Sequence, residues 1–231
     1  MTLADYQAAK AADSRQRITA AATSLFLATS YDRVSVAEVA RRADVSLRTL
    51  YKHFDSKAAL YASVVIAKAE EVTGDLLESI DADAAALAAV EAFALRVMQI
   101  GTRDDVLALW RTIIMEGRRF PQILDAYLQA RQRFTAQVES FLERLEARGD
   151  LCLDDQDAAV MLFIGMLDYK SSLPALIGEP GLDAAGQAKL AHQVAEAVLA
   201  RFGTGDGRCG GERGGDRGTE PGPTAPTPGG D

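Results

Sequence analysis

The chain has 231 residues, enough for one medium domain or two small ones, and 48% of them are hydrophobic, enough to build a core. Aromatic residues make up only 6% of the chain, a composition that favours helices over strands. We therefore expect an all-α protein. The net charge of −8 by itself argues against a nucleic-acid partner, because phosphate binding is driven by basic residues.

The charge is unevenly distributed along the chain. Residues 1–60 carry nine Lys and Arg against six Asp and Glu, whereas residues 61–231 carry sixteen against twenty-seven. A small basic segment followed by a larger acidic one is what a DNA-binding head on a non-binding body should show.

No pattern indicates membrane insertion, metal binding or catalysis. The longest apolar run, Ala158 to Leu167, is too short to span a bilayer, and the N-terminus lacks an apolar signal core. Cys152 and Cys209 lie too far apart to suggest a metal site, and the common catalytic motifs are absent. We expect a soluble cytoplasmic protein that is not an enzyme and has no cofactor, metal ion or membrane partner.

In chain order, residues 1–13 are predicted to form a flexible arm. The first helix is expected from Ser14, since apolar side chains then recur at intervals of three and four residues. Ser35 and Glu38 have the spacing of a capping box, which predicts a second, short helix from Val36 to about Arg42.

A tight turn and a third helix should follow. Ala43-Asp44-Val45 interrupts the pattern, and Ser46 is placed to cap a helix over residues 47–53 with Leu50 facing inward. Ser56 provides the next cap, before a long connecting helix that is expected to continue through Leu77.

Five further helices are predicted near residues 83–100, 104–117, 121–147, 154–171 and 183–202, because glycine and proline separate these stretches. The chain would then comprise about nine helices, with a head over residues 14–60 and a body over residues 61–202. Residues 203–231 contain eleven glycines and four prolines, so this tail is predicted to be disordered.

Two consecutive short helices joined by a tight turn suggest a helix-turn-helix, whose second helix enters the major groove of DNA. The exposed face of residues 47–53 would then offer polar side chains to bases and phosphates. The alternative is an ordinary solvated helix face. For His53, packing beside Phe54 is as well supported as contact with DNA.

The head resembles the DNA-binding domain of the TetR family of bacterial transcriptional regulators. The resemblance rests on Ile18, Ala21-Ala22, Leu25-Phe26, Tyr31, Val34-Ser35-Val36, Val39-Ala40, Ala43, Val45-Ser46, Thr49-Leu50-Tyr51, His53-Phe54 and Ser56-Lys57. Two usual glycines are replaced, by Ser30 and by Asp44, and aspartate tolerates a left-handed turn better than most residues.

The resemblance implies that Tyr51 and Lys57 hold phosphates while Leu47, Arg48, Thr49 and Lys52 face the groove. The full set of predicted DNA contacts is Ser35, Ser46, Leu47, Arg48, Thr49, Tyr51, Lys52, His53 and Lys57.

A second resemblance covers part of the body, where Trp110 to Pro121 is similar to the AefR-like C-terminal class of the family. It implies a ligand pocket enclosed by the helices around residues 60–80, 104–117 and 121–147, and a homodimer formed by the last two helices. The candidate pocket residues are Trp110, Ile114, Phe120, Tyr127, Phe134, Met161, Met166 and Tyr169. The alternative for each is an ordinary place in the core.

Together these features predict a dimeric repressor that binds a palindromic operator in double-stranded DNA and is released by a small apolar or amphipathic effector. The closest alternative is a DNA-binding regulator, activator or repressor, without a small-molecule ligand. A helical enzyme or carrier with an incidental helix-turn-helix is a more distant one.

Overall fold

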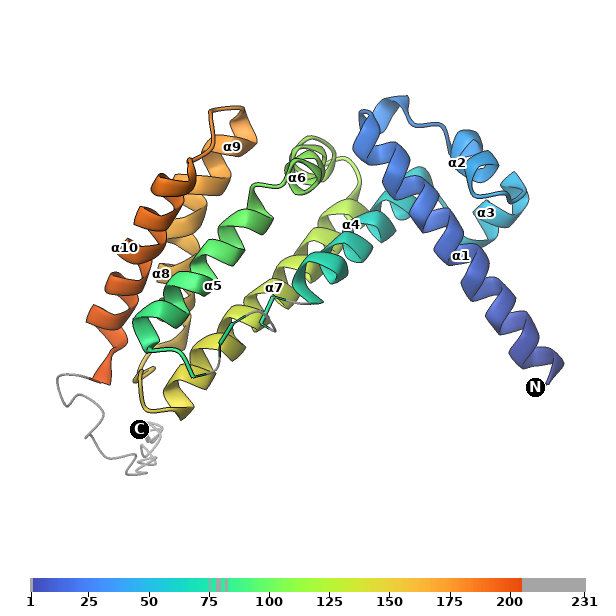
Figure 1. Cartoon of the computed structure of the whole chain (residues 1–231). Helices are drawn as coiled ribbons and strands as arrows, with labels where there is room; N and C mark the ends of the chain where they lie inside the picture. Colours follow the sequence, from blue (N-terminus) through green and yellow to red (C-terminus); the bar gives the residue numbers. More distant parts are fainter. Residues whose placement is uncertain (1, 75, 78–79, 82, 205–231) are drawn as a thin grey trace, which may run out of the picture.

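The computed structural model describes residues 2–204 except residues 75, 78–79 and 82, and this part of the chain confirms the all-α prediction (Figure 1). It contains one isolated β-bridge and no strand. The helices are α1 (Leu3–Ala28), η1 (Tyr31–Arg33), α2 (Val36–Arg42), α3 (Leu47–His53), α4 (Lys57–Gly74), α5 (Ala86–Gly101), α6 (Asp104–Glu116), α7 (Pro121–Ala147), α8 (Gln156–Leu167), η2 (Asp168–Ser172), α9 (Leu173–Ile177) and α10 (Ala184–Phe202).

The head consists of α1, η1, α2 and α3, which pack around a small core at one end of the molecule (Figure 1). Ile18 from α1, Val39 from α2 and Leu50 from α3 are fully buried in it. The predicted bounds of α2 and α3 are confirmed, as is the inward position of Leu50.

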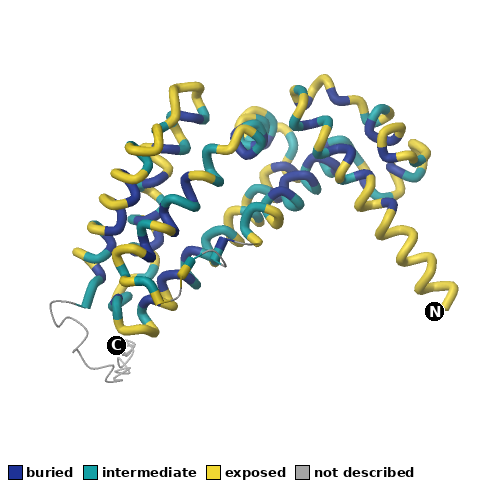
Figure 2. Tube along the Cα trace, viewed as in Figure 1, coloured by how far each residue is buried: buried dark blue, intermediate teal, exposed yellow. Residues whose placement is uncertain are grey.

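The prediction of a flexible arm over residues 1–13 is wrong, because α1 begins at Leu3. Thr2 and Asp5 form the capping box that starts the helix: the Thr2 hydroxyl accepts from the Asp5 amide at 3.1 Å, and the Asp5 carboxylate accepts from the Thr2 amide at 2.7 Å. No glycine or proline interrupts the chain between this cap and Ala28. The added turns of α1 are exposed along their length (Figure 2).

The helix α4 connects head and body. The Ser56 hydroxyl accepts from the Ala59 amide at 3.0 Å, which confirms the predicted cap. The helix ends at Gly74 rather than continuing through Leu77. Glycine has the lowest helix propensity after proline, and the chain beyond it turns so that Leu76 becomes buried in the body.

The body contains α5, α7, α8 and α10, whose apolar faces enclose a second core. Phe93 stacks against both Phe141, at 4.1 Å between ring centroids, and Phe163, at 5.3 Å. The predicted ranges of α5, α6, α7 and α10 agree with the structure to within about three residues at each end. The stretch predicted as one helix over residues 154–171 contains α8 and then the π-helical turn η2, and α9 follows beyond it.

The core of the head extends into the body. Leu109, Ile123 and Ala126 from α6 and α7 belong to the same buried cluster as the head residues. The Tyr61 hydroxyl on α4 also donates to the Leu109 carbonyl at 3.4 Å. The predicted boundary after residue 60 therefore lies inside helix α4 and inside the buried cluster that contains the head.

The stretch Gln156–Ile177 presents apolar side chains to solvent. By length and composition it could cross a membrane, but a single such stretch is weak evidence, and only 17% of its most apolar window is buried. Met161, Tyr169 and Ile177 are each more than 65% exposed. Exposed apolar surfaces of this kind are typical of sites that contact another molecule.

The described chain ends beyond α10. Gly203 pairs with Leu151 in the isolated bridge, and the Thr204 hydroxyl donates to the Gly149 carbonyl at 2.8 Å. The predicted disordered tail therefore starts too early by at least these two residues. The rest of that tail, residues 205–231 including Cys209, lies outside the described residues.

Candidate nucleic-acid interface

The turn between α2 and α3 has the hydrogen bonds of a Schellman motif. The Val45 amide donates to the Ala40 carbonyl at 3.0 Å, and the Asp44 amide donates to the Arg41 carbonyl at 3.2 Å. Asp44 has a φ of 53°, and it is the one residue other than glycine with positive φ in the described chain. The expected left-handed turn at Asp44 is therefore confirmed.

Two arginines on α1 hold the ends of the helix-turn-helix. The Arg17 guanidinium donates to the carbonyls of Ala43, at 2.9 Å, and Asp44, at 3.3 Å, at the end of α2. Arg15 donates to the His53 carbonyl at the end of α3 at 3.3 Å and lies over the Phe54 ring. Both arginines satisfy carbonyls that have no partner within their own helix, so they fix α2 and α3 against α1.

The start of α3 is capped by Ser46, as predicted. Its hydroxyl accepts from the Thr49 amide at 3.0 Å and lies 2.8 Å from the Thr49 hydroxyl. The cap and the buried Leu50 fix the rotation of the helix. Leu47 and Tyr51 are then 43% and 47% exposed.

The exposed face of α3 is polar and basic. Arg48, Thr49, Tyr51 and Lys52 surround a shallow depression of about 390 Å³. Within the part of the chain that the structure describes, neither Arg48 nor Lys52 takes part in an ion pair. The two cations are therefore available to an external anion such as a DNA phosphate.

Ser35 does not form the predicted capping box. Its side chain makes no capping hydrogen bond, although α2 does begin at Val36. Glu38 instead forms a bidentate ion pair with Arg41 at 2.6 and 2.8 Å, because that partner lies one turn further along the same exposed face. The hydroxyl of Ser35 is exposed at the start of α2.

His53 and Lys57 are held more tightly than the rest of the predicted set. His53 is half-buried beside Phe54, and burial together with the nearby Arg15 lowers its pKa. The Lys57 ammonium donates to the Asp32 carbonyl at 3.2 Å and lies 4.6 Å from the centroid of the Tyr31 ring. The geometry favours the packing interpretation for His53.

An aromatic cluster joins the head to the loop between α6 and α7. Tyr31 stacks on Phe26, meets Tyr61 edge-on at 5.4 Å and lies 5.8 Å from Phe120. Burial raises the pKa of Tyr31 to about 12, and the nearby Glu116 adds to this effect. Phe120, predicted as a pocket residue, therefore packs in the core shared by head and body.

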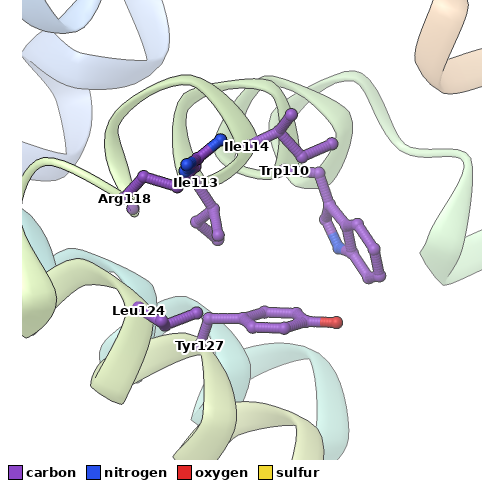
Figure 3. Close-up of a pocket in the computed structure, with 7 residues that line it drawn as sticks. Trp110, Ile113, Ile114, Arg118, Leu124 and Tyr127 are labelled. Carbon is purple, nitrogen blue, oxygen red and sulfur yellow. The ribbon is translucent and has the colours of Figure 1, made fainter.

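A second depression, of about 260 Å³, lies between α6 and α7 (Figure 3). The rings of Trp110 and Tyr127 meet edge-on at 5.4 Å, and burial raises the pKa of Tyr127. The residues lining it are Trp110, Ile113, Ile114, Gly117, Arg118, Leu124 and Tyr127. It opens to solvent on one side, and no α4 residue lines it, so it is not the pocket enclosed by three helices that the resemblance implied.

Three of the eight predicted pocket residues, Trp110, Ile114 and Tyr127, are brought together in this depression. Four others lie elsewhere: Phe134 and Met166 pack against the body core, whereas Met161 and Tyr169 are exposed on α8 and η2. Ile113, Gly117, Arg118 and Leu124 were not predicted to line it. Ile113, Gly117 and Arg118 lie three, seven and eight residues after Trp110, and Leu124 lies three residues before Tyr127. This helical spacing is the signal that could have found them.

Family models identify both parts of the chain. Residues 18–64 match the model described as bacterial regulatory proteins of the tetR family, and residues 88–204 match the AefR-like transcriptional repressor C-terminal domain. The chain belongs to the TetR family. Members of this family are transcriptional regulators that bind DNA and form dimers, which confirms the predicted family and helix-turn-helix.

Solved TetR-family structures share the whole fold. A transcriptional regulator from Mesorhizobium loti is 29% identical with a TM-score of 0.75, over 84% of this chain and 98% of that one. The flavonoid-responsive regulator FrrA is 25% identical with a TM-score of 0.68, over 82% and 97%. A TetR regulator from Agrobacterium tumefaciens is 23% identical with a TM-score of 0.65, over 83% and 95%. No curated protein sequence matches the chain.

Proposed function

We propose that this TetR-family regulator is a cytoplasmic, ligand-responsive repressor that binds a palindromic operator as a dimer and is not an enzyme. The observation that carries the proposal is the exposed face of α3. Arg48, Tyr51 and Lys52 project from a helix whose start, rotation and end are fixed by Ser46, Leu50 and Arg15. A rigid element with unpaired cations and hydroxyls suits base edges and phosphates in the major groove.

The dimer is proposed to form through α8 and α10, with the apolar surface of α8, η2 and α9 in the contact. Met161, Tyr169 and Ile177 are largely exposed in one protomer. A two-fold contact buries the same patch on both copies and presents two α3 helices to successive turns of DNA, roughly 34 Å apart.

The effector is proposed to bind beside Trp110 and Tyr127. The depression there is lined mainly by apolar side chains, which suits an aromatic or amphipathic molecule. The similarity to FrrA, a flavonoid-responsive regulator, favours the same class of ligand for this chain. A ligand that binds one arrangement of α6 and α7 better than another shifts the protein toward that arrangement.

Binding to the promoter DNA that flanks the protein's own gene tests the proposal. We expect saturable binding that weakens with added salt and with Tyr51→Ala or Lys57→Ala. A folded dimer that binds no genomic fragment at low salt would overturn it. The ligand is tested separately, by screening apolar aromatic compounds for a rise in the melting temperature and a loss of operator affinity.

A second candidate is a DNA-binding regulator without a small-molecule ligand, controlled by abundance or by a partner protein. One observation favours it: the depression beside Trp110 is open to solvent, whereas ligand sites usually enclose most of the ligand surface. This candidate predicts the same DNA binding but no thermal shift with any compound in the screen.

A further inference from the structure

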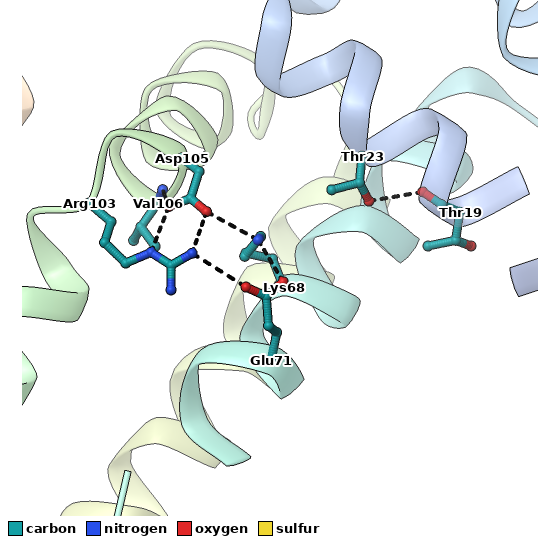
Figure 4. Close-up of polar contacts among 7 residues, drawn as sticks. All are labelled: Thr19, Thr23, Lys68, Glu71, Arg103, Asp105 and Val106. Carbon is teal, nitrogen blue, oxygen red and sulfur yellow. Dashed lines mark hydrogen bonds and ion pairs between the residues drawn. The ribbon is translucent and has the colours of Figure 1, made fainter. Parts of the chain in front are cut away.

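Four charged residues form an alternating network between α4 and the start of α6 (Figure 4). The Lys68 ammonium lies 2.6 Å from a Glu71 carboxylate oxygen and 3.1 Å from an Asp105 oxygen. Arg103 donates twice to Asp105, at 2.7 and 3.0 Å, and lies 3.3 Å from Glu71. Each cation thus contacts both carboxylates.

Lys68 is unusual among the charged side chains. It is 8% exposed, and no other charged residue in the described chain is buried. Burial alone would lower the pKa of Lys68, but Glu71 and Asp105 outweigh it and raise the pKa. Burial of Asp105 is likewise outweighed by Arg103 and Lys68, which lower its pKa. Lys68, Arg103 and Asp105 are therefore charged at neutral pH.

The position of the network matters because α4 leads directly into the head. The first half of α4 is buried in the head core through Leu60, Tyr61 and Val64. The second half carries Lys68 and Glu71, and its backbone makes little close contact with α6. The network is therefore the polar joint that fixes this half of α4 to the helix that carries Trp110.

We propose that Lys68 is a positioning residue for operator recognition, which holds α4, and with it the head, at one angle to α6, in addition to the packing of α4 against α7. This inference rests on the proposed function. Two heads that are already held at a fixed angle lose little orientational freedom when they bind both half-sites of an operator. The joint therefore strengthens binding of the whole operator. A single half-site needs one head only and gains nothing from the joint.

The chain offers a matched control on the neighbouring residue of the same helix. Glu70 forms an exposed ion pair with Arg133 of α7, next to the network but outside it. Glu70→Gln removes an ion pair from α4 as Lys68→Met and Asp105→Asn do, but it leaves the joint with α6 intact.

The first test compares the affinity of the full-length protein for whole-operator and half-site DNA from its own promoter. We expect Lys68→Met and Asp105→Asn to weaken whole-operator binding about tenfold, within the range known for coupling residues, and half-site binding less than twofold. The double variant should lose no more than the larger single loss, because both changes open one joint. Glu70→Gln should bind both DNAs as wild type does.

Equal weakening on both DNAs, additive losses, or the same result for Glu70→Gln would overturn the proposal. Amide hydrogen exchange of the DNA-free protein gives an independent reading. Lys68→Met should raise the amide exchange rate about tenfold or more along residues 66–74 and at the start of α6. Glu70→Gln should leave these rates unchanged. Failure of wild type to bind DNA would count against the proposed function, while unchanged exchange in Lys68→Met would count against the joint.

Discussion

Two exposed surfaces lie at opposite ends of the molecule and differ in chemistry (Figure 1). The face of α3 presents Arg48, Tyr51 and Lys52, whereas the surface of α8, η2 and α9 presents Met161, Tyr169 and Ile177. Exposure itself does not identify a partner. The basic surface suits a polyanion, and the apolar surface suits an equally apolar partner, for which a second copy of the chain is the simplest choice.

The largest expected effect comes from a charge placed on the apolar surface. Met161→Asp should raise the dimer dissociation constant about a hundredfold or more, because the interface would bury an unpaired carboxylate. Analytical ultracentrifugation over a concentration series measures this. Met115→Asp on α6 is the control, since Met115 is 76% exposed and Met161 72%. A dimer unaffected by Met161→Asp would mean that the protomers meet elsewhere.

On the basic surface, Tyr51→Ala should weaken operator binding by about 1.5 kcal/mol, roughly tenfold, because a hydrogen bond to a phosphate is lost. Its thermal stability should hardly change, since the side chain is 47% exposed. Fluorescence anisotropy with labelled promoter DNA measures the affinity. Arg33→Ala, an exposed head residue outside α3, is the control. Similar losses of affinity for both variants would mean that the exposed face of α3 does not recognise the operator.

Ser35 precedes α2 and Ser46 precedes α3, and the two serines together test whether a helix cap stabilises the head. Ser46→Ala should destabilise the protein by about 1 kcal/mol, because the Thr49 amide loses its acceptor. Ser35→Ala should change the stability much less, because Ser35 makes no capping hydrogen bond. Urea unfolding of both variants measures the difference. Equal effects would show that the cap does not stabilise α3.

The smallest effect is expected in the body, where His192 on α10 contacts Glu91 and Glu196. The hydrogen bond with Glu91 raises the pKa of His192, with the charge of Glu196 adding to it. The stabilisation that this contact gives is therefore complete below the ordinary histidine pKa of about 6.5. It is lost as the pH rises through the pKa that His192 has in the folded protein. Glu91→Gln should lower the melting temperature slightly at pH 5.5 and leave it unchanged at pH 9. The reverse pH dependence would contradict this sign.

The head was the more predictable region from sequence because its signals are local. Four correct predictions each depend on residues within one helical turn. They are the caps formed by Ser46 and Ser56, the left-handed turn at Asp44 and the inward position of Leu50. The two local errors, the flexible arm and the Ser35 capping box, came from competing local partners. Thr2 and Asp5 start α1 early, and Arg41 takes the carboxylate of Glu38.

The candidate pocket was predicted less well because it depends on which helix faces are apposed. Phe120, Met161 and Ile114 have the same apolar character in the sequence, yet one packs on Tyr31, one is exposed on α8 and one lines the depression. The charged joint at Lys68 was missed for the same reason, since Asp105 lies 37 residues further along the chain. Helical periodicity identifies an apolar face but not its neighbour.

The central claim is that two α3 helices, held in a dimer, read one operator. Footprinting of the full-length protein on its own promoter tests this directly. The account predicts two protected half-sites related by two-fold symmetry, with centres about one helical turn, roughly 34 Å, or a small multiple of it apart, and protection lost with Tyr51→Ala. A single unsymmetric site, or protection that survives Tyr51→Ala, would contradict it.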